Sequence, residues 1–410
     1  MNSADVTFDE ADVLRSVRRW RRPCRLTLAG LGVLLICAFP ALAASRDCVG
    51  DNDVEANTRI AACTRMIEDP TEPSDSHAAA YFKRGNALAA QGDFDHAIAD
   101  YGKVIDYNPN FANGYLNRGI TWLHKGDNDR AIPDFDKVIS LDPANGDAYY
   151  NRGLAWTYKG DNDRAIADYT DAIKFNPKDT RAYNNRGLIW SRKGEDDRAI
   201  ADFDRVIELA PEIASVYNSR GDAWDHKKDD DRAIADYSKV ISLDPKNVHA
   251  YYRRGMAWSR KGDKDRAIAD YSQVISLDPK DPSIRYNRAL IWFEKGDFDR
   301  AVADNDEAIR LGLNNVYVYN NRGLAWSAKG DDSRAIADYD LAIGIDPKNV
   351  DAYYNRGNSW ARKGDYDSAI ADYDRAISLD PQDAGLYNNR GMSWKTKGDV
   401  DRALEQNPSG

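Results

Sequence analysis

Along most of the chain, apolar and small residues recur in two triplets, and each triplet follows the i, i+4, i+7 spacing of one helix face. In residues 146–179 the triplets are Tyr149, Gly153 and Trp156, then Ala165, Tyr169 and Ala172. A short segment with the sequence Lys-Gly-Asp, residues 159–161, separates them. Glycine suits the left-handed cap that ends a helix, and aspartate can cap the start of the next helix. The pattern therefore predicts a helical hairpin.

The hairpin pattern returns at a fixed interval of 34 residues, marked by an Arg-Gly pair or, once, by Arg288-Ala289. A constant period of this size is typical of a solenoid of stacked repeats. We predict an all-α fold in which residues 78–410 form ten 34-residue helix-turn-helix repeats, the last one truncated. The repeats begin at residues 78, 112, 146, 180, 214, 248, 282, 316, 350 and 384.

This order of positions resembles the tetratricopeptide-repeat family, whose pattern is aromatic, Leu, Gly, Tyr, then Ala, aromatic, Ala and Pro. The resemblance covers residues 78–410 and implies a right-handed α-solenoid whose first helices line an inner, concave face. One departure recurs, because arginine stands where the family commonly has leucine. We predict that this arginine pairs with the aspartate of the recurring Ala-Asp-Tyr segment, as Arg152 with Asp168. The alternative is that the arginine stem lies along the core while its charged end stays in water.

Two further features of the repeat indicate how it packs. Glycine in the middle of a helix costs about 1 kcal/mol relative to alanine, so its recurrence predicts close contact between the two helices. We expect Gly153 to lie against Ala165, the small residue of the second helix. Nine of the ten tryptophans occupy position 11, counted from the first residue of a repeat. We predict that this row is core, since burying one indole removes roughly 150–250 Å² from water.

Binding would take place on the inner face, where the resemblance places positions 2, 5, 6, 9, 12 and 13. Position 6 is asparagine in seven repeats, and an amide can both donate to and accept from the backbone of an extended peptide. The candidate partner-binding groove comprises Asn117, Tyr150, Asn151, Asn185, Arg192, Tyr252, Arg253, Arg260, Tyr286, Asn287, Asn321, Tyr354, Asn355, Arg362 and Asn389. The alternative is a solvated face whose asparagines only satisfy neighbouring helices.

The first 43 residues differ from the repeats. Several arginines precede an apolar run, residues 26–43, which ends in Ala41-Leu42-Ala43, the small-x-small pattern of a signal-peptidase site. We predict an export signal over residues 1–43 or, alternatively, an uncleaved N-terminal anchor, which is the only membrane association that we expect. The mature chain would be periplasmic or secreted, as part of a bacterial cell envelope.

Residues 44–77 are predicted to form an N-terminal cap helix and a linker. Residues 53–68 fit the second helix of a repeat, with Cys63 at the position of the second aromatic residue. Cys48 and Cys63 are the only cysteines after the predicted signal, and export would place them in an oxidising compartment. We predict a disulfide between them that staples the cap, against the alternative of two unpaired thiols.

The composition argues against several function classes. A net charge of −10 disfavours a nucleic-acid partner, which would require a basic surface. The five histidines are scattered, and the sequence has no phosphate loop, zinc pair or nucleotide fingerprint, so we predict no catalysis and no cofactor. Asp222, Asp225 and His226 are spaced i, i+3 and i+4 and could seat a divalent metal, but a solvated polar patch is the favoured interpretation.

Together these observations favour an exported, non-catalytic scaffold or adaptor that binds proteins or extended peptides through the concave groove. Two alternatives stay open. One is a self-associating structural rod of the cell envelope, a homo-oligomer formed through its C-terminal end. The other is a metal-binding accessory factor to an envelope enzyme.

Overall fold

The computed structural model describes residues 46–50 and 54–404 of the 410-residue chain, so the predicted signal, residues 1–43, lies outside the described residues. Every regular element in the described ranges is a helix. None of these helices combines the length and the apolar character needed to cross a bilayer. The chain divides into two units, Met1–Lys137 and Val138–Gly410.

The first unit begins with a short helical turn at residues 46–49. Its helices are α3 (Ala56–Glu68), α4 (Ser74–Ala90), α5 (Phe94–Tyr107), α6 (Ala112–His124) and α7 (Asn128–Leu141), the last of which contains the unit boundary. Helix α4 packs against both α3 and α5, and α5 packs against α6. From α4 onward, the even-numbered helices are the first helices of the repeats and the odd-numbered ones are the second helices.

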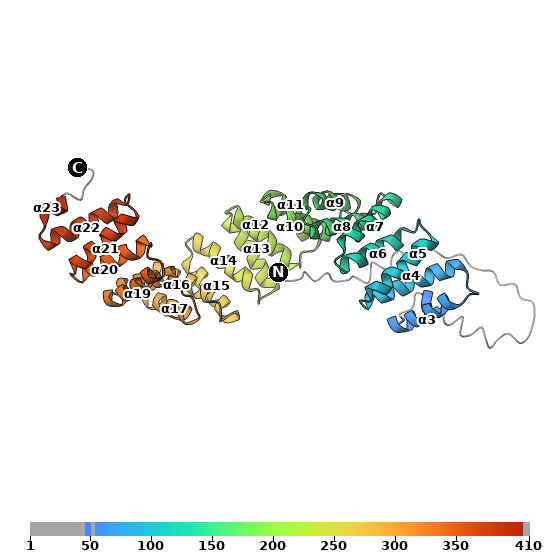
Figure 1. Cartoon of the computed structure of the whole chain (residues 1–410), viewed down its shortest axis with the longest axis horizontal. Helices are drawn as coiled ribbons and strands as arrows, with labels where there is room; N and C mark the ends of the chain where they lie inside the picture. Colours follow the sequence, from blue (N-terminus) through green and yellow to red (C-terminus); the bar gives the residue numbers. More distant parts are fainter. Residues whose placement is uncertain (1–45, 51–53, 405–410) are drawn as a thin grey trace, which may run out of the picture. The chain divides into compact units, whose positions relative to one another are not determined.

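The second unit continues the alternation of first and second helices (Figure 1). Its helices are α8 (Gly146–Tyr158), α9 (Asn162–Phe175), α10 (Thr180–Arg192), α11 (Asp196–Leu209), α12 (Ala214–His226), α13 (Asp230–Leu243), α14 (Val248–Arg260), α15 (Lys264–Leu277), α16 (Pro282–Glu294), α17 (Phe298–Arg310), α18 (Val316–Ala328), α19 (Asp332–Ile345), α20 (Val350–Arg362), α21 (Tyr366–Leu379), α22 (Ala384–Lys397) and α23 (Val400–Leu404). Each second helix from α9 to α21 packs against the first helices of its own and of the next repeat. This arrangement confirms the predicted all-α solenoid of 34-residue helical hairpins.

The turn inside each hairpin follows from its Gly-Asp pair. Gly160 has a φ of 80°, in the left-handed region that glycine adopts without penalty. The side chain of Asp161 accepts a hydrogen bond from the backbone N–H of Arg164 and so caps α9. In the fifth repeat Lys228 takes the glycine position with a φ of 62°, the only non-glycine residue with positive φ among the described residues.

The predicted arginine–aspartate ladder is confirmed. Arg152 donates through Nε to Asp168 Oδ2 at 2.9 Å and through Nη2 to Oδ1 at 2.6 Å, and the aspartate is 4% exposed. The same two-bond pairs are Arg84–Asp100, Arg118–Asp134, Arg186–Asp202, Arg220–Asp236, Arg254–Asp270, Arg288–Asp304, Arg322–Asp338 and Arg356–Asp372. The third guanidinium nitrogen, Nη1, usually donates to the second helix of the preceding repeat. Its acceptor is the residue that follows the buried aromatic residue of that helix, as Arg186 Nη1 donates at 2.9 Å to Thr170 Oγ1, which follows Tyr169. The ladder therefore joins three helices at most steps.

The mid-helix glycine is required by an aromatic ring, and its predicted partner was wrong. A Cβ on Gly153 would lie 2.9 Å from Cε1 of Tyr169, whereas Ala165 is not among its nearest neighbours. The fully buried ring turns its edge onto the first helix, which leaves no room for a side chain there. Only the seventh repeat has alanine at this position, Ala289, and there the ring is replaced by Asn305.

The tryptophan row packs against the core, as predicted, but it lies at the edge of the core and not at its centre. All nine position-11 tryptophans are only partly buried. Trp156 packs against a buried cluster that contains Tyr169, and its outer face is covered by Arg164, whose Cζ lies 3.6 Å from the ring centroid. The indole sits beside the turn, where an arginine of the second helix replaces water over its face. The centre of the core is the aromatic residue of the second helix.

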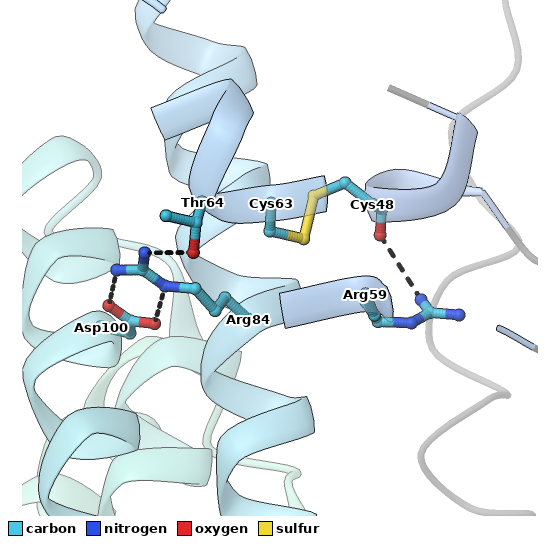
Figure 2. Close-up of a disulfide and its surroundings, with 6 residues drawn as sticks. All are labelled: Cys48, Arg59, Cys63, Thr64, Arg84 and Asp100. Carbon is cyan, nitrogen blue, oxygen red and sulfur yellow. Dashed lines mark hydrogen bonds and ion pairs between the residues drawn. A yellow bond between two sulfur atoms is a disulfide. The ribbon is translucent and has the colours of Figure 1, made fainter. Parts of the chain in front are cut away.

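The N-terminal cap is a shortened hairpin closed by a disulfide (Figure 2). Cys48, in the turn at residues 46–49, and Cys63 of α3 are both fully buried, with their sulfur atoms 2.08 Å apart. Arg84 of α4 donates to Asp100 and, through Nη1, to Thr64 on α3 at 2.9 Å. Since Thr64 directly follows Cys63, the cysteine holds the place at which a repeat has its buried aromatic ring.

Candidate functional site

The candidate groove lies on the face formed by positions 2, 5, 6, 9, 12 and 13 of each repeat, here named the first-helix face. Its position-6 asparagines donate to the preceding first helix. Asn185 Nδ2 lies 3.3 Å from Tyr150 Oη, and Asn355 Nδ2 lies 3.3 Å from Asn320 Oδ1. The asparagines thus join consecutive first helices, as the alternative interpretation of this face expected.

The same link recurs toward the end of the second unit. Asn389 Nδ2 donates to Tyr354 Oη at 3.1 Å and to Asn358 Oδ1 at 3.0 Å, so it contacts two turns of the preceding first helix. Asn287 Nδ2 lies 3.5 Å from Tyr252 Oη, at the long end of hydrogen-bonding distance. Within the described residues, the Oδ1 atom of Asn389 accepts no hydrogen bond and stays available to a ligand.

Three further asparagines complete the predicted set. Burial raises the pKa of Tyr286, and a hydrogen bond with Asn321 opposes that shift. Asn151 departs from the pattern, because its Nδ2 donates to a main-chain carbonyl of its own helix at 2.8 Å. In the first unit, Asn117 Nδ2 donates to Asn86 Oδ1 at 2.9 Å.

The position-5 tyrosines are less accessible than a contact surface requires. Tyr150 is buried, its ring packs against Tyr169 with the centroids 5.8 Å apart, and Arg181 lies over it at 4.4 Å. Burial raises the pKa of Tyr150. Tyr252, Tyr286 and Tyr354 are partly buried. These tyrosines therefore mainly pack against the core beneath the first-helix face and offer little surface to a ligand.

Sequence reasoning missed an apolar stripe at position 9. The stripe consists of Leu154, Leu188, Met256, Leu290 and Leu324, interrupted by Asp222. Leu188 is 37% exposed, and the neighbouring positions add Tyr158 at 58% and Tyr317 at 64%. The signal was present in the sequence as an apolar residue that returns every 34 residues between polar ones. A cavity of about 310 Å³ on the same face, between α20, α21 and α22, is lined by Asn358, Arg362, Tyr373, Asn389 and Met392.

Two of the predicted groove arginines belong to one ion-pair cluster between the fifth and sixth repeats. Arg253 lies 3.2 Å from Asp222 and 3.0 Å from Asp225. Arg260 bonds to Asp225 and lies 2.5 Å from Asp230. The hydrogen bond to Asp230 raises the pKa of Arg260. These arginines are therefore neutralised by the preceding repeat.

The other two predicted arginines differ from each other. Arg362 lies 2.8 Å from Asp332 and also bonds to Ser327 and Ser359. Arg192 is exposed and makes no ion pair or hydrogen bond with any described residue. The predicted groove thus contains one unpaired arginine.

The metal hypothesis is wrong for the cluster in which it was placed. Guanidinium groups of Arg253 and Arg260 hold the carboxylates of Asp222 and Asp225, and His226 Nδ1 lies 3.5 Å from a different residue on α11. Among the described residues, no group of three or more His, Cys, Asp or Glu side chains is arranged to hold a metal ion. The residues form an ion-pair network.

Family models for tetratricopeptide repeats match most of the repeat region. One model matches residues 82–148, 123–157, 150–212, 192–248, 229–282 and 252–315, and two others match residues 327–364 and 350–383. The first model alone spans residues 82–315, which is more than half of the chain. None of the curated proteins compared matches the chain.

Several solved structures are similar to parts of the chain. The MamA protein is 31% identical over 41% of this chain and 92% of its own, with a TM-score of 0.39. YrrB, described as a TPR protein with an unusual peptide-binding site, is 24% identical over 46% of this chain and 95% of its own, with a TM-score of 0.40. A tetratricopeptide-repeat protein from Parabacteroides merdae is 21% identical over 60% of this chain and 98% of its own, with a TM-score of 0.42.

Proposed function

Because the chain belongs to the tetratricopeptide-repeat family, we propose that it is an exported, non-catalytic scaffold that binds proteins or extended peptides through its first-helix face. Tetratricopeptide-repeat proteins are protein-interaction scaffolds with protein or peptide partners, and the fold is typically non-catalytic. The absence of catalysis in this chain stays a prediction from its sequence.

One observation carries the choice of the first-helix face. In the second unit this face presents a periodic apolar stripe, with Leu188, Tyr158 and Tyr317 substantially exposed. Toward the end of the same face, Oδ1 of Asn389 has no hydrogen-bond donor among the described residues. An extended peptide offers what this surface lacks, namely apolar side chains and backbone N–H donors.

Site-specific photocrosslinking in cells tests this choice of face. We expect a photoreactive residue at Tyr158 or Tyr317 to form adducts with a partner. The matched controls are Leu341 and Ile345 on the second helix α19, which are apolar and 49% and 45% exposed, and they should form few adducts. Equal adducts from both faces would contradict the proposal.

Export is proposed from residues 1–43 alone, which are outside the described residues. The periplasmic or secreted location and the oxidised Cys48–Cys63 pair follow from the same proposal. Intact-mass measurement of the protein from its native host should give a chain that starts near Ala44 with no free thiol. A full-length chain in the membrane fraction would support the anchor instead.

Self-association is a second candidate function. It is favoured by three exposed apolar side chains on α22 and α23, namely Met392, Val400 and Leu404. Light scattering of the purified protein should then give a mass that rises with concentration, and substitution of these three residues by serine should restore the monomer. A monomer at all concentrations would exclude this candidate.

A further inference from the structure

A charge rule links four repeats of the second unit, the fifth, sixth, seventh and ninth, each to the repeat before it. The position-13 residue of a first helix lies against the position-17 residue that begins the preceding second helix. Arg260 pairs in this way with Asp230 at 2.5 Å, and Arg362 with Asp332 at 2.8 Å. His226 lies 3.5 Å from Asp196 by the same rule.

The rule also holds when the charges are exchanged. In the seventh repeat position 13 is Glu294, and position 17 of the sixth repeat is Lys264, with 3.4 Å between Nζ and Oε2. A charge at position 13 is therefore accompanied by the opposite charge 30 residues earlier, whichever sign it has.

Arg192 is the exception to this rule. Position 17 of the preceding repeat is Asn162, and position 12, which supplies Asp225 to Arg260, is Thr157. Neither side chain carries a charge, so Arg192 is exposed without a carboxylate among the described residues. Its backbone position is that of Arg260 and Arg362, which end α14 and α20 as Arg192 ends α10.

The surroundings of Arg192 offer apolar surface. Leu188, one turn earlier on α10, is 37% exposed, and Tyr158, at position 13 of α8, is 58% exposed. The carboxylates that α12 presents on this face are Asp222 and Asp225, and both are held by Arg253.

From this geometry we infer that the third and fourth repeats bind an extended segment in which an acidic side chain lies next to apolar residues. Arg192 binds the carboxylate, and Leu188 and Tyr158 contact the apolar side chains. The charge-assisted bond that the preceding repeat supplies to Arg260 and Arg362 is supplied here by the partner. This inference rests on the proposed function, whose first-helix face it assigns to a class of ligand.

The test supplies the missing carboxylate from within the protein. In an Asn162→Asp variant, α9 begins with aspartate, as α13 and α19 already do. A negative charge in the first turn also stabilises a helix. The new aspartate should pair with Arg192 and leave that residue in place. Arg192→Gln removes the cation directly, and Arg334→Gln removes an arginine of the second helix α19 that is already paired with Asp331 and lies outside the first-helix face.

The probe is an array of random peptides with amidated C-termini, so that the only carboxylates are those of side chains. Wild-type protein should retain peptides enriched in Asp or Glu beside Leu, Ile or Phe. The selected peptides, measured in solution, should bind Asn162→Asp and Arg192→Gln roughly threefold to tenfold more weakly. Binding to Arg334→Gln should be unchanged.

Failure of this inference can be distinguished from failure of the proposed function. The inference is overturned if the retained peptides have no acidic preference, or if Asn162→Asp does not weaken that preference, and in either case the proposed function still stands. An array on which the wild-type protein retains no peptide counts against peptide binding by the first-helix face, and the inference fails with it.

Discussion

Two pairs of repeats in the second unit share one backbone design but join their first helices by different chemistry. Between the third and fourth repeats the position-6 link is neutral, with the amide of Asn185 donating to Tyr150 at 3.3 Å, and the ion pair between these first helices, Arg181 with Asp147 at 2.9 Å, lies at position 2. Between the fifth and sixth repeats the link is ionic, with Arg253 at 3.2 Å from Asp222 and 3.0 Å from Asp225. Beneath both links, the same arginine–aspartate ladder holds each hairpin together.

This difference shows that pairs of residues about one repeat apart determine whether a contact on the first-helix face is neutral or ionic. Where position 6 changes from asparagine to Arg253, position 9 of the preceding repeat changes from leucine to Asp222. The carboxylate also accepts the hydroxyl of Tyr237 at 2.7 Å, and burial raises the pKa of that tyrosine. A charge on this face is therefore available to a ligand only where its internal partner is missing.

The largest expected effect concerns the ladder that both pairs of repeats share. Asp202→Ala in the fourth repeat and Asp270→Ala in the sixth each leave a partly buried arginine without its two-bond partner. We expect each to lower the local unfolding free energy by about 3 kcal/mol, measured by native-state hydrogen exchange of the flanking helices. Asp204→Ala is the control, since its half-exposed carboxylate should contribute no more than about 1 kcal/mol. Unequal losses at Asp202 and Asp270 would show that the ladder is not equivalent in the two pairs.

The ladder and the hairpin could be predicted from sequence because both depend on short, constant separations. Arg152 and Asp168 are 16 residues apart in one hairpin, and the helix period places them on facing sides. The partner of Gly153 could not be found in this way. It depends on the direction in which the ring of Tyr169 points, which tertiary packing decides.

The role of the first-helix face was harder to predict because its contacts run between repeats. Asn185 and Asn389 are 35 residues from their tyrosine partners, but Asn389 also bonds to a residue 31 positions earlier. Which of these separations forms a contact depends on the rotation between successive hairpins, which the period does not specify. The unpaired state of Arg192 requires a comparison with position 17 of the preceding repeat, and that comparison becomes possible only when the pairs of Arg260 and Arg362 are known.

A smaller effect should separate the ionic link from the neutral one. Asp225→Ala removes the carboxylate shared by Arg253 and Arg260, and we expect a loss of about 1–2 kcal/mol in the local stability of α12 and α14. Thr157→Ala at the same position of the third repeat removes a 3.0 Å bond to the Tyr169 hydroxyl and should cost about 0.5–1 kcal/mol. Salt at about 1 M, where the Debye length is roughly 3 Å, weakens ion pairs and leaves a neutral hydroxyl bond unchanged. It should therefore reduce only the first loss, and by a modest amount because Asp225 is buried. Equal losses that salt leaves unchanged would remove the distinction between the links.

The smallest effects are expected at the turns, where each pair of repeats contains one unusual residue. Lys228 of the fifth repeat holds a φ of 62° at a position where the other hairpin turns have glycine, and Glu195 of the fourth repeat begins α11 without a side-chain cap. Lys228→Gly should stabilise its hairpin by about 1 kcal/mol, because glycine adopts positive φ without the clash of a Cβ.

Glu195→Asp should stabilise the fourth repeat by about 0.5–1 kcal/mol, because aspartate can accept the N-cap bond that Asp161 accepts from the N–H of Arg164 in the third repeat. Thermal unfolding and native-state hydrogen exchange would measure the change in stability of each variant. Gly160→Lys is the reciprocal control and should destabilise its hairpin by a similar amount. If Lys228→Gly gave no gain, the strain at this turn would have to be relieved elsewhere in the fifth repeat, and the ionic link to the sixth repeat would be the first place to look.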